Sequence, residues 1–306
     1  MRWVTYRTTA DPLPRAGIVD DAGEQVAAPY VGRPLASLLA EGHESLAKAG
    51  RRAEEDPVER VAMADVSLLA PIPEPPSIRD FMAFEEHVVT SLGALGQEID
   101  PVWYMQPVFY FSNPAAILGP HDDVTIAPGS RQFDYELEVC AVIGRPGSDL
   151  DPDTAVNHIA GYTVFCDWSA RDLQAAEMRV GLGPAKGKDT ATSLGPFLVT
   201  PDELEDRARG QGFDLAMTAR VNGVQYSSGR WSDLHWSFAE MVAHASRGTR
   251  VRAGDVIGAG TVGTGCILEL ARVHGESAFP YLRAGDVVEL EVERLGVIRS
   301  TVRART

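Results

Sequence analysis

Three carboxylates that could hold a metal ion stand in two short segments near the middle of this chain. Glu136 and Glu138 lie two residues apart in the apolar run 133–139. Because side chains of a β-strand alternate between its two faces, a strand here would point both carboxylates the same way. A lone pair of this kind is more often a solvated strand face. A third acid, Asp167, ends the apolar run 162–167, and this makes a shared site the better interpretation.

Three carboxylates gathered in a partly buried pocket would repel one another and raise one another's pKa values unless a cation neutralised them. Ligation by oxygen alone favours hard cations over zinc. We therefore expect Mg²⁺, with Mn²⁺ or Ca²⁺ as alternatives. Mg²⁺ retains water ligands that a substrate with two oxygens can displace.

Two further kinds of side chain could act on a bound substrate. His87 follows Asp80 by seven residues in a segment, about 80–95, whose apolar residues recur at three- and four-residue spacing. This spacing predicts a helix that carries both residues, although a lone histidine on a helix is more often structural. Lys186 and Lys188 occupy a glycine-rich stretch without the spacing of a phosphate-binding loop, so a lysine that faces the substrate is the functional alternative.

A glycine-rich segment, Gly258-Ala-Gly-Thr-Val-Gly263, matches the GxGxxG pattern of dinucleotide-binding proteins. It lies late in the chain in a strand-rich region, without the strand–helix–strand context that the pattern requires. We interpret it as an active-site turn and expect no nicotinamide cofactor.

Proline and strand patterns divide the chain at about residue 70. Four prolines occur within residues 70–78, and proline favours an extended connector. We predict a small N-terminal cap domain over residues 1–70, with a helix near 35–49, and a catalytic domain over 71–306. In the second domain, runs rich in Val and Ile alternate with Gly, Pro and Asp turns, which predicts an α+β, mostly β fold. The expected strands are 124–127, 135–143, 161–167, 215–221, 255–259 and 287–294.

Composition excludes several classes of partner. The formal charge of -15 argues against nucleic acid and anionic membranes, because both are bound by clustered Lys and Arg. The sequence contains no run of eighteen apolar residues, the length that predicts a membrane span, and its N-terminus has no long apolar core. We therefore expect a cytoplasmic protein. The three cysteines show no CxxC spacing and favour neither a zinc site nor a disulfide framework.

Taken together, these segments resemble the fumarylacetoacetate hydrolase family over about residues 80–270. Four segments in the family's order carry the resemblance: Asp134-Tyr-Glu-Leu-Glu138, Asp167-Trp-Ser-Ala-Arg-Asp-Leu-Gln174, Lys186-Gly-Lys-Asp-Thr190, and Gly260-Thr261 ahead of Leu268-Glu-Leu270. The resemblance implies a mixed β-roll catalytic domain with a small N-terminal domain, and a homodimer.

The resemblance also implies roles for individual residues. The metal ligands would be Glu136, Glu138, Asp167 and, as in the animal-type enzymes, Asp80. His87 matches the family's water-activating histidine, and Glu269 matches the acid that orients it. The side chains that hold the substrate's oxygens would be Lys186, Gln174, Tyr110 and Thr261. Met178 stands where the animal enzymes resemble one another in having a tyrosine, and the cap is shorter, so fumarylacetoacetate itself is not the expected substrate.

The implied function is a divalent-metal-dependent hydrolase that cleaves a C–C bond in a small 2-oxo or 1,3-dioxo acid. The metal would polarise the carbonyl and accept enolate charge. His87, oriented by Glu269, would activate water, and Lys186 with Gln174 would stabilise the oxyanion.

Other functions on the same scaffold stay open. A decarboxylase, isomerase, tautomerase or hydratase of a 2-oxo acid needs the same metal and the same enolate, so the metal ligands do not separate these reactions from hydrolysis. A non-catalytic protein of this fold is disfavoured, because the proposed ligands and Lys186 are all retained. Residues 84–100, which include two glycines, are predicted to form a lid over the substrate.

Overall fold

The computed structural model describes residues 1–93 and 96–305, and a long mixed β-sheet forms its frame. The strands of this sheet are β1 (Arg2–Thr8), β2 (Arg15–Val19), β3 (Gln25–Ala28), β4 (Glu59–Ala62), β5 (Val66–Leu69), β6 (Ile78–Phe81), β7 (Phe109–Ser112), β8 (Ile117–Leu118), β11 (Leu137–Ile143), β12 (Ile159–Asp167), β14 (Thr192–Val199) and β19 (Val256–Gly258). Their order is β4-β3-β2-β1-β14-β12-β11-β19-β6-β7, with β5 paired to β1 and β8 paired to β14.

A second sheet packs against the middle of the first. Its strands are β9 (Val124–Thr125), β17 (Ala216–Val221), β18 (Val224–Arg230), β20 (Val287–Val292) and β21 (Gly296–Arg303), in the order β18-β17-β20-β21-β9. Two short pairs complete the strands of the described residues: β10 (Phe133–Asp134) with β13 (Ser169–Ala170), and β15 (Ala208–Arg209) with β16 (Gly212–Phe213).

The helices are short and lie around these sheets. The α-helices are α1 (Leu35–Ala40), α2 (His43–Glu55), α3 (Glu85–Gly93), α4 (Pro152–Ala155), α5 (Arg171–Met178), α6 (Phe238–Ser246) and α7 (Ile267–His274). The 3-10 helices are η1 (Met63–Asp65), η2 (Pro101–Tyr104), η3 (Val156–His158), η4 (Lys186–Lys188), η5 (Pro201–Glu203), η6 (Glu205–Arg207) and η7 (Trp231–Asp233). In the part of the chain that the structure describes, no helix combines the length and apolarity needed to cross a membrane.

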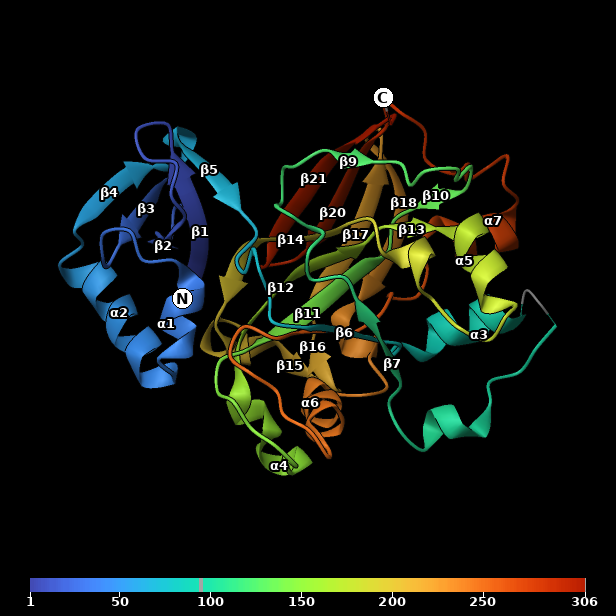
Figure 1. The fold of residues 1–306 in the computed structure, drawn as a ribbon, viewed down its shortest axis with the longest axis horizontal. Helices are drawn as coiled ribbons and strands as arrows, with labels where there is room; N and C mark the ends of the chain where they lie inside the picture. The colour runs from blue at the N-terminus through green and yellow to red at the C-terminus, as the bar shows by residue number, and fades with distance from the viewer. Residues whose placement is uncertain (94–95, 306) are drawn as a thin grey trace.

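The N-terminal segment forms a module at one side of the molecule, drawn in blue in Figure 1. Its strand β1 pairs with β14, so the long sheet continues from this module into the rest of the chain. The domain boundary at residue 70 stays a prediction, and residues 71–77 form neither helix nor strand, as the prolines indicate. The helix expected near 35–49 is present as two helices: α1 and α2 are separated at Gly42, whose φ of 94° ends helical geometry.

Strand β11 lies at the centre of two hydrophobic cores. Alternate residues of β11, such as Val139 and Ala141, belong to the core between the two sheets. Cys140 and Val142 face a second core, which also contains residues of α1 and α2. Burial of both faces explains why this strand is apolar without interruption from Val139 to Ile143. By the same alternation, the carboxylates that precede Cys140 at two-residue intervals share its face.

The strands expected in the second domain are confirmed with small differences at their ends, and so is the α+β, mostly β fold. The helix expected over about 80–95 is only partly correct. Asp80 lies in β6, which pairs with β19 and β7, and α3 begins at Glu85. Sheet hydrogen bonds therefore override the helical spacing at its start. Residues 94 and 95 belong both to this expected helix and to the lid expected over 84–100, and they lie outside the described residues. The lid itself stays a prediction.

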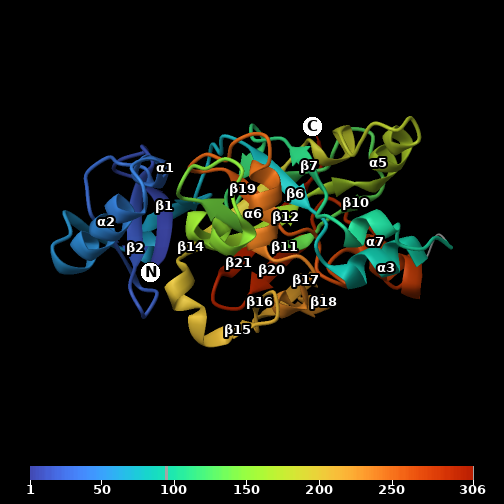
Figure 2. The same cartoon turned by 90° about the horizontal axis from the view of Figure 1, so that it is seen from below.

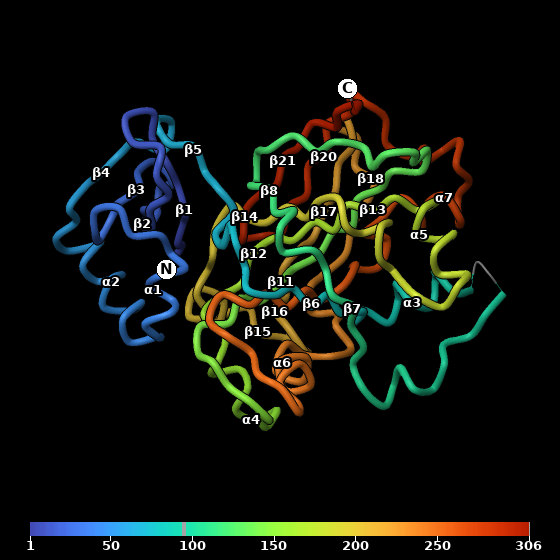
Figure 3. Tube along the Cα trace, in the orientation of Figure 1, coloured from blue at the N-terminus to red at the C-terminus, as the bar shows by residue number. Residues whose placement is uncertain are grey.

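Helices α3, α5 and α7 gather at the side of the molecule opposite the N-terminal module, and the two views of Figures 1 and 2 agree on this arrangement. In Figure 3 the chain beyond Gly96 makes a wide excursion that contains η2 before it returns as β7. Strands β6, β11 and β12 carry the acidic side chains Asp80, Glu138 and Asp167.

Candidate functional site

The antiparallel pairing of β11 with β12 brings Glu136 and Glu138 close to Asp167. Leu137 is opposite Cys166, so the acids that flank this pair meet at the end of the ladder. Asp80 reaches the same place from β6, two strands away through β19. The oxygens of Asp80, Glu136 and Asp167 lie within 4.8 Å of one another.

Close approach of β6 and β19 depends on Gly258, a residue of the GxGxxG segment. A Cβ atom at this position would lie 2.5 Å from Asp80 Oδ1. Gly260, with a φ of 80°, donates its N–H to Glu138 Oε2 at 2.9 Å. The glycines thus serve close packing and backbone hydrogen bonding in the site, which fits the active-site turn expected from the sequence.

Burial and mutual repulsion raise the pKa values of three of the four acids. Burial, followed by the charges of Asp167 and Glu136, raises the pKa of Asp80 to about 7. The pKa of Glu138 is raised well above its usual range, again chiefly by burial and then by Asp80. Burial also raises the pKa of Asp167, against the opposing charge of Lys188. In the absence of a metal ion these three carboxyl groups therefore hold their protons more tightly than free carboxyl groups do.

Glu136 differs because two cations hold it. Lys188 Nζ lies 2.6 Å from Glu136 Oε2, and Arg171 Nη1 lies 2.8 Å from Glu136 Oε1. Burial opposes ionisation of Glu136, but the positive charges of Lys188 and Arg171 outweigh it and lower the pKa. Glu136 is ionised throughout the physiological range.

The donor set fits a hard divalent cation. Three buried carboxylate oxygens accept no hydrogen bond from the residues described here: Asp80 Oδ1, Glu138 Oε1 and Asp167 Oδ1. A buried, unpartnered carboxylate oxygen is costly unless a cation lies against it. Because every candidate ligand is an oxygen, Mg²⁺, Mn²⁺ or Ca²⁺ suits the group better than zinc.

His87 and Glu269 meet beside this cluster. His87 Nδ1 shares a hydrogen bond with Glu269 Oε1, which links α3 to α7 across 182 residues of sequence. The other oxygen of Glu269 accepts the backbone N–H of Thr264 at 2.6 Å. This arrangement fixes the imidazole through Nδ1. The two side chains form the pair that the resemblance implies.

The two lysines of η4 differ in position. Lys188 is 4% exposed and binds Glu136 and Asp167, whereas the Lys186 side chain is 70% exposed and pairs with Asp189. The structure therefore brings Lys188, and not Lys186, to the carboxylates, and the role expected for Lys186 stays a prediction. Both lysines stand in one polar stretch, and only the path of η4 decides which of them turns inward.

The other three residues expected to bind the substrate, Thr261, Gln174 and Tyr110, differ in the hydrogen bonds that their side chains make. Thr261 is 2% exposed, and its hydroxyl has no hydrogen-bond partner among the described residues. The Gln174 side chain accepts a hydrogen bond from Arg171 at 3.2 Å. The Tyr110 hydroxyl lies 2.8 Å from Asp80 Oδ2 and also contacts Asp167, so its partners are the candidate metal ligands.

Asp134 is a site residue that the sequence analysis did not assign. Its Oδ2 lies 2.8 Å from Arg171 Nε, and its two oxygens accept the N–H groups of Ile267 and Leu268 at 2.8 and 3.0 Å. Asp134 thereby caps the start of α7, the helix that carries Glu269, while orienting the arginine that holds Glu136. The sequence feature that could have indicated its role is its position at the start of the segment Asp134-Tyr-Glu-Leu-Glu138, two residues before Glu136.

Several of these side chains line one cavity of about 510 Å³. Its polar lining includes Asp80, His87, Tyr110, Glu136, Arg171, Gln174, Lys188, Thr261 and Arg272, and its apolar lining includes Phe81, Met82, Leu92, Val108, Phe109, Met178 and Leu268. A cavity of this size holds a small organic acid with several carbon atoms.

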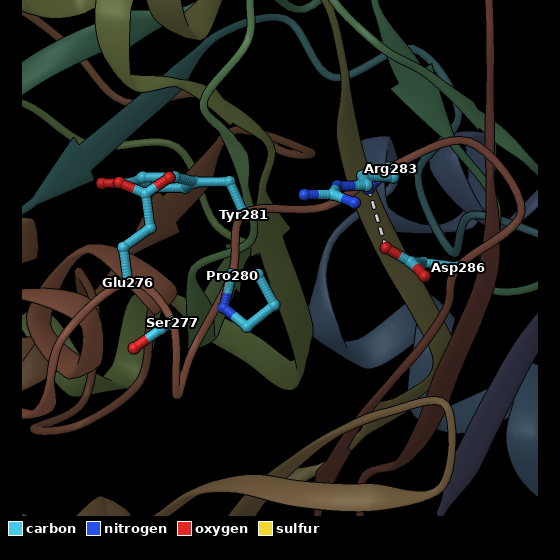
Figure 4. A pocket seen from close by; sticks show the side chains of 6 residues that line it. All are labelled: Glu276, Ser277, Pro280, Tyr281, Arg283 and Asp286. Atoms are coloured by element: carbon cyan, nitrogen blue, oxygen red, sulfur yellow. Dashed lines mark hydrogen bonds between the residues drawn. The ribbon is translucent and has the colours of Figure 1, made fainter.

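A second hollow lies after α7, and Figure 4 shows its lining side chains from close by. Glu276 and Arg283 are exposed, and Asp286 accepts the Arg283 backbone N–H at 2.7 Å. It lacks the buried cluster of acids that distinguishes the first cavity, so we take the first as the candidate active site.

Comparison with known proteins identifies the architecture. Residues 77–303 match the family model described as fumarylacetoacetate (FAA) hydrolase, C-terminal. The chain belongs to the fumarylacetoacetate hydrolase family. This confirms the resemblance drawn from the sequence, and the expected fold with it.

Members of this family with different names align along the whole chain. The mitochondrial oxaloacetate tautomerase fahd2 of Xenopus laevis is 29% identical over 99% of this chain and 90% of its own length. A probable 2-hydroxyhepta-2,4-diene-1,7-dioate isomerase from Mycobacterium abscessus has a TM-score of 0.71 and 28% identity, with both chains fully covered. A fumarylacetoacetate hydrolase from Exiguobacterium antarcticum has a TM-score of 0.75 and 27% identity, again with full coverage. The family thus includes proteins named for isomerisation and for hydrolysis.

Proposed function

We propose that this protein is a divalent-metal-dependent enzyme that interconverts the keto and enol forms of a small 2-oxo acid. The observation that carries the proposal is the His87–Glu269 pair, in which His87 lines the same cavity as Asp80 and Glu136. An oriented histidine beside a cation site is the minimum needed to move a proton at a carbon next to a carbonyl. The names of the Xenopus and Mycobacterium relatives support this reaction class over hydrolysis.

The metal would be held by Asp80, Glu136, Glu138 and Asp167, and Mg²⁺ is the ion we propose. When bound, it would supply a Lewis acid that polarises the 2-oxo group and lowers the barrier to enolisation.

The protein's own residues would handle the proton and the charge. His87 would take a proton from the carbon beside the carbonyl, and the imidazolium that forms, stabilised by Glu269, would give that proton to the enolate oxygen. The reverse direction would move the proton from the enol oxygen through His87 back to the carbon. Lys188 and the unpartnered hydroxyl of Thr261 would donate hydrogen bonds to the substrate oxygen on which negative charge develops. Apolar walls such as Leu92 and Leu268 would limit access of water to the enolate.

Hydrolysis of a C–C bond, the reaction expected from the sequence, is the second candidate. The same His87–Glu269 pair favours it, because a histidine oriented through Nδ1 leaves its other nitrogen to activate water. The Exiguobacterium relative carries the corresponding name. A cytoplasmic location and a homodimer remain predictions.

One experiment separates the two candidates. Enol absorbance would follow tautomerisation of oxaloacetate, and product analysis would follow cleavage of acetylpyruvate and fumarylpyruvate, each with Mg²⁺ and with EDTA. The variants are wild type, His87→Asn and, as a control, His274→Asn, which changes an exposed histidine at the end of α7.

We expect Mg²⁺-dependent tautomerisation that falls roughly 100- to 10,000-fold in His87→Asn and is retained in His274→Asn. Cleavage of an acylpyruvate with the same pattern, and without tautomerisation, would replace the first candidate with hydrolysis. Tautomerisation that survives the loss of His87 would refute its assignment as the base.

A further inference from the structure

The cavity presents one cation that the site itself does not use. Among the described lining residues, the charged lysine and arginine side chains are Arg171, Lys188 and Arg272. Arg171 and Lys188 are buried and bound to carboxylates, as described above. Arg272 forms no ion pair with any described residue, and it donates Nη1 to the backbone carbonyl of Ser91 at 2.9 Å. Its guanidinium keeps further donors for a ligand.

Arg272 lies beyond the acid–base pair, at the solvent end of the cavity. It follows Glu269 by three residues on α7, and its partner Ser91 follows His87 by four residues on α3. Residues at these spacings lie on the same side of a helix. The two helices therefore face each other through two contacts in succession, the His87–Glu269 pair and the Arg272–Ser91 bond. Arg272 is exposed, whereas the acids are buried.

Apolar side chains also line this cavity. Leu92, Met178 and Leu268 line the cavity, and they suit the carbon chain of a substrate better than its charged groups. A molecule that suits this lining carries oxygens for the buried polar side chains, a short carbon chain for the apolar side chains and an anionic group for Arg272.

We infer that Arg272 binds a second carboxylate of the substrate, so that the enzyme takes 2-oxo dicarboxylates in preference to monocarboxylates. The inference rests on the proposed function and adds the substrate class to it. The planar guanidinium matches a carboxylate through two parallel hydrogen bonds, which gives selectivity as well as attraction.

The test compares acids that differ only in the second carboxylate. Calorimetry would measure binding of 2-oxoglutarate and 2-oxopentanoate, and of 2-oxoadipate and 2-oxohexanoate, to the Mg²⁺-loaded protein. The variants are Arg272→Ala and Arg272→Gln, the latter able to keep a hydrogen bond to the Ser91 carbonyl. Arg250→Ala removes an exposed arginine that is not among the lining residues and serves as the charge-matched control.

We expect wild type to bind at least one diacid roughly 10- to 100-fold more tightly than its matched monoacid. Both Arg272 variants should lose this preference while their monoacid affinity is unchanged, and Arg250→Ala should behave as wild type. No diacid preference in wild type, or a preference that survives both Arg272 variants, would overturn the inference. An equal loss for both kinds of acid would also overturn it and make Arg272 a brace between α3 and α7.

Turnover separates this inference from the proposed function. Wild type that binds diacids through Arg272 but neither tautomerises oxaloacetate nor cleaves acylpyruvates would refute the proposed reaction and leave the carboxylate subsite standing. Tautomerisation of oxaloacetate and of its 4-methyl ester with equal kcat/KM would refute the subsite and leave the reaction standing.

Discussion

Lys188 donates a hydrogen bond to Asp167 across 2.7 Å in a part of the site that excludes solvent. Burial alone would lower the pKa of Lys188, but the negative charges of Asp167 and Glu136 outweigh it and raise the pKa. The side chain therefore stays a cation and can stabilise negative charge on the substrate. Lys186, two residues earlier, lies at the surface.

Lys188 and Lys186 form a matched pair for mutagenesis. We expect Lys188→Met to lower kcat/KM about 100- to 1,000-fold, the usual cost of removing one donor to developing charge. Lys186→Met should stay within about twofold of wild type, because a surface substitution seldom changes stability or geometry much. Steady-state kinetics with the preferred substrate checks both values. A larger loss in Lys186→Met would contradict the placement of the two side chains.

Metal binding should depend on pH because the acids of the site hold protons when no cation is bound. The pKa of Asp80 is raised to about 7 and that of Glu138 is raised well above its usual range, so a divalent ion must displace protons as it binds. We expect Mg²⁺ affinity to increase from pH 6 to pH 8, with proton release detectable by calorimetry in buffers of different ionisation enthalpy. Affinity that is independent of pH would exclude these residues as ligands.

The same raised pKa values predict the stability of the metal-free protein. At pH values between the ordinary carboxylate pKa of the unfolded chain and the raised pKa of the folded protein, the folded state binds more protons than the unfolded state. The free energy of unfolding of the metal-free protein therefore falls as the pH rises through this range. The increase in Tm that Mg²⁺ produces should therefore grow from about pH 5 to above pH 7. Asp80→Asn should flatten this trend, which thermal unfolding at several pH values can measure.

Gly258 offers a test of the packing between β6 and β19. An alanine Cβ would lie 2.5 Å from Asp80 Oδ1, so the carboxylate must move although the backbone conformation suits alanine. We expect Gly258→Ala to weaken Mg²⁺ binding at least tenfold, about 1.4 kcal/mol, while the protein remains folded. Gly93→Ala is the control, since no atom of the residues that the structure describes lies within 4 Å of its added Cβ. Wild-type affinity in Gly258→Ala would place Asp80 outside the metal site.

Asp134 should position both Arg171, which holds Glu136, and helix α7, which carries Glu269, without contacting the substrate. Replacing it with asparagine removes one of the two buried carboxylates that pair with Arg171 and leaves only Glu136, and removing one partner of a buried ion pair costs up to roughly 3 to 5 kcal/mol. We expect Asp134→Asn to lower the Tm and to weaken both metal binding and turnover, because α7 and Arg171 lose the same anchor. Asp189→Asn, which changes a partly exposed acid, should do neither. Loss of turnover with unchanged Tm and metal affinity would instead give Asp134 a direct role.

Local sequence determined much of this protein. Alternation along 133–139 placed Glu136 and Glu138 on one face of a strand, and the apolar run before Asp167 predicted the neighbouring strand that ends at the site. Glycine, proline and β-branched residues predicted the mostly β fold, because their backbone preferences act within a few residues. The order of the segments along the chain was enough to indicate the family.

Tertiary structure decided what depends on contacts between distant segments. Asp80 and His87 have helical spacing, yet pairing of β6 with β19 and β7 draws Asp80 into the sheet and leaves His87 on α3. The path of η4 turns Lys188 inward and Lys186 outward, although both lysines stand in the same polar stretch. Each of these outcomes results from packing and hydrogen bonds across many residues, and such interactions override local propensity when the two conflict.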